Sequence, residues 1–189
     1  MRFLSPSRCA PGTLASPLAR SLGRAGWSAY LGDPEQVRDL SLEGIVEVRG
    51  DLDRVPALAG ELVRLSPRRG FLFLGGDAAD VAERIRGEGV LAYDATAALA
   101  GLAIASEQVL RRLTDLDLDS IPTAGPFARV SAVFRRGADG WFHVYVQQEL
   151  GHYVAEAVLD TLAGLDVSPD QVRDQVPDLT PGREQTTWR

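Results

Sequence analysis

Two aspartates follow a β-branched segment in the sequence IVEVRGDLD, residues 45–53, and they are the first candidates for chemistry. A carboxylate at the end of a buried strand can act as a nucleophile. An aspartate at the start of a helix instead accepts hydrogen bonds from the free N–H groups of the first turn. We favour the capping interpretation for Asp51 or Asp53 and keep a reactive Asp51 as the alternative.

The chain contains no lysine, because its 20 basic residues are all arginines. Mechanisms that require lysine, such as Schiff-base formation or phosphate binding by a P-loop, are therefore excluded. The single cysteine, Cys9, allows no disulfide within the chain. The two histidines, His143 and His152, have no third ligand at metal-binding spacing. We predict neither a metal nor a cofactor.

A Gly-Gly pair separates an apolar run from a helical pattern in FLFLGGDAAD, residues 71–80. Such a junction can bind phosphate at the start of the helix. Here Asp77 and Asp80 occupy the first helical turn, where they favour the positive end of the dipole and would repel a phosphate. We interpret the pair as an ordinary tight turn.

Strand alternation predicts one face that carries Trp141, His143 and Tyr145. Aromatic side chains with a polar group suit protein interfaces, so this face is a candidate interface. Packing of the same face against the last helix is an equal alternative.

A basic face is a second candidate surface, formed by Arg111, Arg112, Arg135 and Arg136. Nucleic-acid binding depends on such a basic footprint. The net charge of −6 counts against this function without excluding a local basic face.

Short apolar runs alternate with helical patterns along the first part of the chain. The expected strands are GIVEVRG (44–50), FLFLGG (71–76) and VLAYDA (90–95), and the expected helices cover 33–44, 52–70, 77–89 and 96–116. The four large apolar residues of FLFL are typical of a strand buried on both faces. Repeated strand–helix units predict an α/β fold with a doubly wound, mostly parallel sheet.

The pattern changes after Pro122. Residues 128–148 predict a β-hairpin that turns at Gly137–Gly140, and residues 149–165 predict an amphipathic helix. We therefore expect an α/β domain over 1–121, a hairpin and helix extension over 122–166, and a flexible tail over 167–189.

The order of elements over residues 1–113 resembles a response-regulator receiver domain. GIVEVRGDLD is similar to the family's third strand, and SPRRGFLFLGGDAADVAERIRGEGVLAYDA to its fourth strand, next helix and fifth strand. The resemblance implies a flavodoxin-like sheet with Asp51 at the phosphoacceptor position. The acids after the first strand, the hydroxyl after the fourth and the lysine after the fifth are missing, which implies a pseudo-receiver. A weaker resemblance, through VEVRGDLD and SEQVLRRLTDLDLDSI, is to the STAS domain.

The functional prediction is a non-catalytic regulatory or scaffolding module in bacterial signalling. Its expected partner is another protein or a second copy of itself in a homo-oligomer. No apolar run approaches the length of a membrane span, and we expect a cytoplasmic protein. The alternatives are an enzyme or nucleotide-binding protein with a site at the carboxyl ends of parallel strands, and a nucleic-acid-associated protein that uses the arginine face.

Overall fold

Two antiparallel sheets form the centre of the computed structural model, which describes residues 18, 36–41, 43–56, 60–74 and 77–166. The four-stranded sheet has the order β3 (Gly60–Ser66), β4 (Arg69–Leu74), β2 (Gly44–Arg49) and β5 (Leu91–Asp94). The five-stranded sheet has the order β1 (Val37–Asp39), β6 (Leu99–Ile104), β9 (Phe142–Gln147), β8 (Val130–Arg136) and β7 (Thr123–Phe127).

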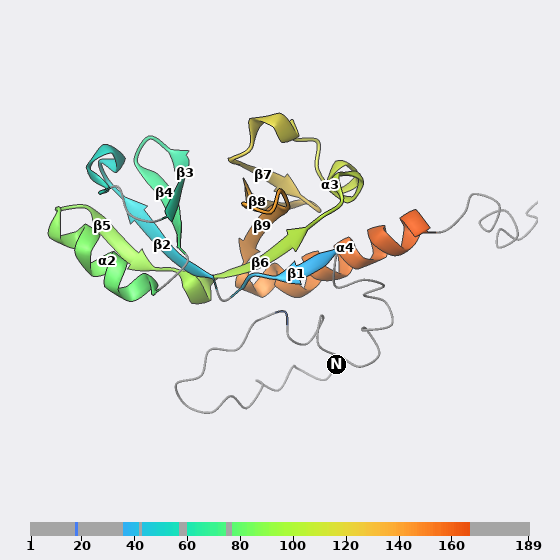
Figure 1. Ribbon diagram of the computed structural model, residues 1–189, viewed down its shortest axis with the longest axis horizontal. Coiled ribbons are helices and arrows are strands. Elements are labelled where there is room, and N and C mark those ends of the chain that lie inside the picture. Colours follow the sequence, from blue (N-terminus) through green and yellow to red (C-terminus); the bar gives the residue numbers. More distant parts are fainter. Residues whose placement is uncertain (1–17, 19–35, 42, 57–59, 75–76, 167–189) are drawn as a thin grey trace, which may run out of the picture.

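Helices cover the outer faces of both sheets (Figure 1). The α-helices are α2 (Ala78–Gly87), α3 (Glu107–Leu113) and α4 (Gly151–Asp166), and the 3-10 turns are η1 (Leu52–Arg54), η2 (Thr96–Ala98), η3 (Leu118–Ser120) and η4 (Gln148–Leu150). Helix α2 packs on the four-stranded sheet, whereas α3 and α4 pack on the five-stranded sheet. The order of layers is therefore helix, sheet, sheet, helix.

Strand β4 shows how the sequence builds these layers. Its side chains alternate, so Leu72 and Leu74 pack with Ile85 of α2, while Phe71 and Phe73 pack in the cluster between the sheets. Strand β9 alternates in the same way in the five-stranded sheet. Tyr145 packs in the cluster between the sheets, and its neighbours Val144 and Val146 pack with α4.

The predicted doubly wound parallel sheet is wrong, because every strand pair among the described residues is antiparallel. The prediction rested on the repeated strand–helix pattern and on FLFL, which is indeed buried on both faces. A helix covers one face of this strand and a second sheet covers the other. Apolar composition alone cannot distinguish that arrangement from a parallel sheet between two helix layers. The site expected at the carboxyl ends of parallel strands has no counterpart in the described part of the chain.

Three of the predicted helices are also wrong. The region 33–44 contributes β1, the region 52–70 forms η1 and then β3, and the region 96–116 forms η2, β6 and the short helix α3. All six residues of β6 are buried between layers. The close packing there requires Gly101, since a Cβ at this position would lie 2.7 Å from Cε1 of Tyr145. Tertiary packing therefore overrides the helical preference of an Ala-rich segment.

Several local predictions are confirmed. Strands form at β2, β4 and β5, and Asp77 caps α2 by accepting a hydrogen bond from the backbone N–H of Ala79 at 2.8 Å. The hairpin β8–β9 turns at Gly137–Gly140, and α4 follows it. Strand β6 pairs with β9, so residues on either side of position 121 share the five-stranded sheet. The predictions for Cys9, for Gly75–Gly76 and for the tail 167–189 concern residues outside the described ranges.

Candidate functional site between the sheets

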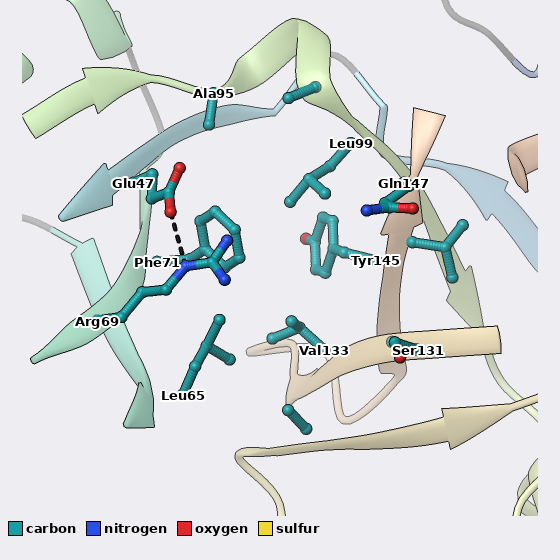
Figure 2. A pocket seen from close by; sticks show the side chains of 14 residues that line it. Glu47, Leu65, Arg69, Phe71, Ala95, Leu99, Ser131, Val133, Tyr145 and Gln147 are labelled. Atoms are coloured by element: carbon teal, nitrogen blue, oxygen red, sulfur yellow. Dashed lines mark hydrogen bonds and ion pairs between the residues drawn. The ribbon is translucent and has the colours of Figure 1, made fainter. Parts of the chain in front are cut away.

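A cavity of about 320 Å³ lies between the two sheets (Figure 2). The four-stranded sheet contributes Glu47, Leu65, Arg69 and Phe71, the five-stranded sheet contributes Ser131, Val133, Tyr145 and Gln147, and small side chains such as Ala95 and Ala98 leave the space unfilled. This volume is near the lower end of the range for small-ligand sites. Polar and aromatic side chains converge in this cavity.

Glu47 carries the negative charge at one wall of the cavity. Its Oε1 accepts hydrogen bonds from Nε of Arg49 at 2.8 Å and from Nε of Arg69 at 2.7 Å. Burial alone would raise the pKa of Glu47, but the hydrogen bonds and charges of the two arginines outweigh it and hold the pKa below its ordinary value. One ionised carboxylate is therefore shared by two cations.

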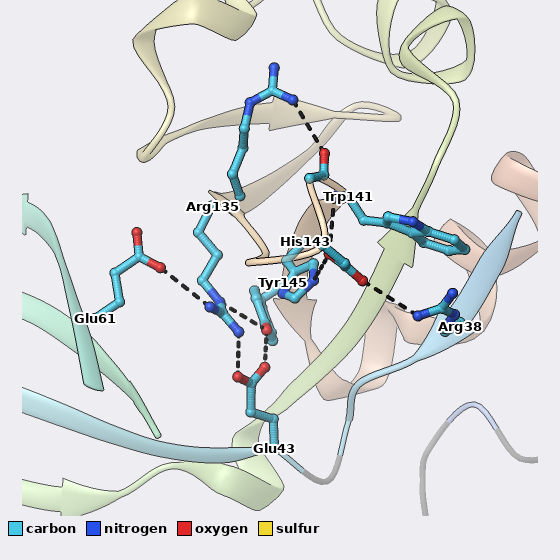
Figure 3. Close-up of polar contacts among 10 residues, drawn as sticks. Arg38, Glu43, Glu61, Arg135, Trp141, His143 and Tyr145 are labelled. Atoms are coloured by element: carbon cyan, nitrogen blue, oxygen red, sulfur yellow. Dashed lines mark hydrogen bonds and ion pairs between the residues drawn. The ribbon is translucent and has the colours of Figure 1, made fainter. Parts of the chain in front are cut away.

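A cluster of charged and hydrogen-bonded side chains joins the two sheets beside the cavity (Figure 3). We call Glu43, Glu61, Arg135 and Tyr145 the inter-sheet clasp. The guanidinium of Arg135 donates to Glu43, to Oε2 of Glu61 at 3.3 Å and to the Tyr145 hydroxyl at 3.3 Å, and that hydroxyl donates to Glu43. Arg135 and Tyr145 belong to the five-stranded sheet and Glu61 to the four-stranded sheet, so the clasp holds the sheets together.

The protonation states of the clasp follow from burial and pairing. Burial, and then the hydrogen bond to Glu43, raise the pKa of Tyr145 well above its usual value. Burial alone would lower the pKa of Arg135, but Tyr145 and Glu43 outweigh it and raise that pKa. Tyr145 therefore stays protonated and Arg135 stays cationic, and neither side chain can act as a base near neutral pH.

His143 lies beside the clasp and is buried. Its Nε2 is 3.9 Å from Oδ1 of Asp139, and its Nδ1 has no hydrogen-bond partner among the described residues. Burial, and then the positive charge of Arg135, lower the pKa of His143. Near neutral pH the ring is therefore neutral.

The candidate interface face is divided by the structure. Tyr145 packs in the cluster between the sheets, and His143 is buried near Asp139. Trp141 is only partly buried and stacks with Arg38, whose guanidinium carbon is 3.9 Å from the ring centre. Arg38 also donates to Asp139 at 3.4 Å (Figure 3).

Asp51 is exposed and caps η1, with its Oδ1 accepting from the backbone N–H of Asp53 at 3.2 Å. The capping interpretation of Asp51 is therefore confirmed. The element that Asp51 caps is a single 3-10 turn, however, and not the long helix that was expected there. The four arginines of the predicted basic face do not gather on one surface. Arg135 lies between the sheets, Arg136 stacks on Phe142, and Arg111 and Arg112 lie on α3 at the opposite face of the five-stranded sheet.

Sequence reasoning missed Glu43 and Glu61. Glu43 is 92 residues and Glu61 is 74 residues from Arg135 along the chain, so no local spacing indicates that they meet. In the described ranges, no group of three or more histidine, cysteine, aspartate or glutamate side chains is placed to hold a metal ion, and no helix is long and apolar enough to cross a membrane.

Comparison with known proteins gives a fold but no family. No protein-family model and no curated protein sequence match the chain. The fold resembles a chain of the heterotetrameric sarcosine oxidase from Corynebacterium sp. U-96, whose structure was solved in complex with pyrrole 2-carboxylate. The TM-score is 0.67 at 14% sequence identity, and the match covers 82% of this chain and 97% of that chain.

This likeness corrects the resemblances drawn from the sequence. The receiver and STAS interpretations are wrong. The fold matches a sarcosine oxidase chain, and the two sheets of this chain are antiparallel, whereas the receiver resemblance implied a parallel sheet. The signalling role that the receiver resemblance implied is therefore withdrawn. At this level of identity the match shows the fold alone.

Proposed function

We propose that this chain is a non-catalytic subunit of a multi-chain oxidase and that it contributes binding surface to the assembly. The observation that carries the proposal is the fold match, which covers nearly all of a chain that belongs to a heterotetramer. The expectation of a scaffolding module that contacts another protein is retained in this form, without the signalling role.

The chemistry of the site supports a structural contribution. Arg135, Tyr145 and Glu43 satisfy one another, and Arg135 also binds Glu61 of the other sheet. Tyr145 is held protonated by its surroundings, and His143 is buried without a reacting group beside it. A general base must be unprotonated and within reach of the proton that it removes. Tyr145 is held protonated and His143 does not line the cavity, so neither side chain meets both conditions.

The test is to isolate the full chain with an affinity tag from the cells in which it occurs. Native mass spectrometry should find it in a complex with chains of other sequence. Oxygen consumption with sarcosine, the substrate named for the matched enzyme, should be measured for the complex and for the chain alone. The chain alone should be inactive. Isolation of a free chain without partners, or sarcosine oxidation by the chain alone, would contradict the proposal.

A further inference from the structure

We propose that the inner face of the four-stranded sheet, at the mouth of the cavity, is the surface on which a partner subunit docks. We define this docking face by Leu91 and Tyr93 of β5, Arg49 of β2 and Arg69 of β4. The partner segment presents an apolar side chain next to a carboxylate. This inference rests on the proposed function and names the surface through which it acts.

Exposed hydrophobic side chains locate the face. Leu91 is 57% exposed and Tyr93 is 49% exposed, and Tyr153 is the other large hydrophobic that is exposed among the described residues. The hydroxyl of Tyr153 has a structural role, since it donates to the backbone carbonyl of Ala128 at 2.8 Å. Leu91 and Tyr93 are two positions apart on one strand, so they point to the same side of the sheet. An adjacent pair of this kind marks an interaction site more strongly than scattered single residues do.

The strand register makes the pair continuous with the cavity. Tyr93 lies opposite Glu47, which lies opposite Phe71, and both Glu47 and Phe71 line the cavity. One row further out, Leu91 lies opposite Arg49, which lies opposite Arg69. Residues directly opposite each other share a face. The docking face therefore runs without interruption from the exposed row into the cavity, where an apolar side chain from a partner can be buried.

The charge of the face indicates a carboxylate in the partner. Arg49 and Arg69 are each about half exposed, at 52% and 49% of the side chain, and both bond to the same oxygen of Glu47. Among the described residues, the two arginines share the single carboxylate of Glu47, so one positive charge has no counterpart there, in a chain whose net charge is −6. Arginine N–H groups that Glu47 does not use remain available, and a carboxylate is the group that a guanidinium binds in bidentate geometry.

The backbone at the edge of β5 indicates that the partner docks on the face of the sheet and does not add a strand beside β5. The backbone N–H of Ala95 donates to the carbonyl of Ile45 at 2.8 Å, so the backbone groups of Ala92, three residues earlier, point away from β2. The carbonyl of Ala92 accepts a hydrogen bond from Nη1 of Arg86 at 2.9 Å. An arginine of α2 therefore occupies the acceptor that an added strand would need, which is a common way to protect a sheet edge.

The test uses the complex isolated through the tagged chain and the partner chains recovered from it. Re-association is measured for the wild-type chain, for the double variant Leu91→Ser/Tyr93→Ser and for Tyr153→Ser as the matched control. Hot-spot residues in pockets govern affinity, so we expect the double variant to bind at least about tenfold more weakly and the control to bind as the wild type does. Thermal unfolding of each free chain shows that the variants are folded.

Two further measurements complete the experiment. Amide hydrogen exchange of residues 90–95 should be slower in the complex than in the free chain. The variant Arg49→Gln/Arg69→Gln should bind more weakly and with a smaller salt dependence than the wild type. Arg84→Gln, a change of an exposed arginine on α2, is its control.

The outcomes separate the two proposals. A complex that forms normally with Leu91→Ser/Tyr93→Ser overturns the docking face and leaves the proposed function standing. A free chain that forms a dimer weakened by this variant shows a second copy as the occupant and also overturns it. A chain that is isolated from its cells without any partner contradicts both proposals.

Discussion

The substitution Arg135→Met tests whether the inter-sheet clasp stabilises the fold. The change keeps an unbranched side chain of moderate length but removes the cation that pairs with Glu43, Glu61 and Tyr145. The Arg135 side chain is 11% exposed and Glu43 is 20% exposed, so the carboxylate left behind is mostly shielded from water. Loss of one partner from a buried pair is costly because the other charge stays uncompensated.

The magnitude follows from the burial of each contact. The fully buried case costs about 3–5 kcal/mol, and partial exposure of Glu43 reduces this to an expected loss of about 2–4 kcal/mol. In a chain of this size each kcal/mol lowers the Tm by about 2–4 °C, so we expect a decrease of roughly 5–15 °C. Glu61 is 39% exposed and 3.3 Å away, so Glu61→Gln should cost less than about 1 kcal/mol.

Urea denaturation followed by circular dichroism measures these free energies of unfolding. A double-mutant cycle with Glu43→Gln isolates the pair, because the double variant no longer contains an uncompensated carboxylate. It should lose less stability than the sum of the two single variants. A stabilising role of the inter-sheet clasp is refuted if Arg135→Met lowers the free energy of unfolding by less than about 0.5 kcal/mol, or if the effects of the two substitutions are additive.

Three further changes test the packing and the protonation states around the clasp. Gly101→Ala should lose about 1–3 kcal/mol because its Cβ would lie 2.7 Å from the Tyr145 ring, whereas Gly87→Ala, with nothing within 4 Å, should be neutral or slightly stabilising in the same urea titration. The lowered pKa of His143 means that the unfolded chain binds the histidine proton at a higher pH than the folded chain does, so stability should fall as pH decreases below 6.5. This slope should shrink in His143→Gln. The raised pKa of Tyr145 means that the contribution of this residue to stability is complete below pH 10 and is lost at higher pH. Phenolate absorbance should show that Tyr145 ionises only on unfolding, as a step that is lost in Tyr145→Phe.

Local signals in the sequence predict the elements whose structure depends on near neighbours. Asp77 precedes an amphipathic pattern and caps α2, and Gly137 and Gly140 bound the turn of a hairpin whose strands alternate as expected. These features are set within a few residues of chain, so pattern and turn chemistry are sufficient.

Elements that depend on distant partners could not be read in the same way. Strand β3 follows Pro56 and carries apolar residues at helical spacing, yet it pairs with β4, with Val63 opposite Phe71. Strand β6 has the composition of a helix, but it pairs with β9, and only a glycine at position 101 leaves room for the ring of Tyr145, its cross-strand partner. The direction of the strands depends on such pairings, which is why the parallel sheet was predicted wrongly.

The candidate site was only partly accessible to sequence reasoning. Tyr145 and His143 stood out as polar aromatic residues on one strand face. The structure places Tyr145 in the clasp and at the cavity wall, and it buries His143 beside the clasp. Glu43, the acidic partner of Tyr145, is 102 residues away along the chain, and a contact between residues so far apart follows from the sheet packing rather than from any motif.

The most direct measurement is a cryo-electron microscopy reconstruction of the complex isolated through this chain. Our account predicts a partner subunit of different sequence against Leu91 and Tyr93, with an apolar side chain in the cavity, a carboxylate at Arg49 and Arg69, and the clasp intact. A reconstruction in which this inner face is open to solvent while the partner chains bind elsewhere would contradict it.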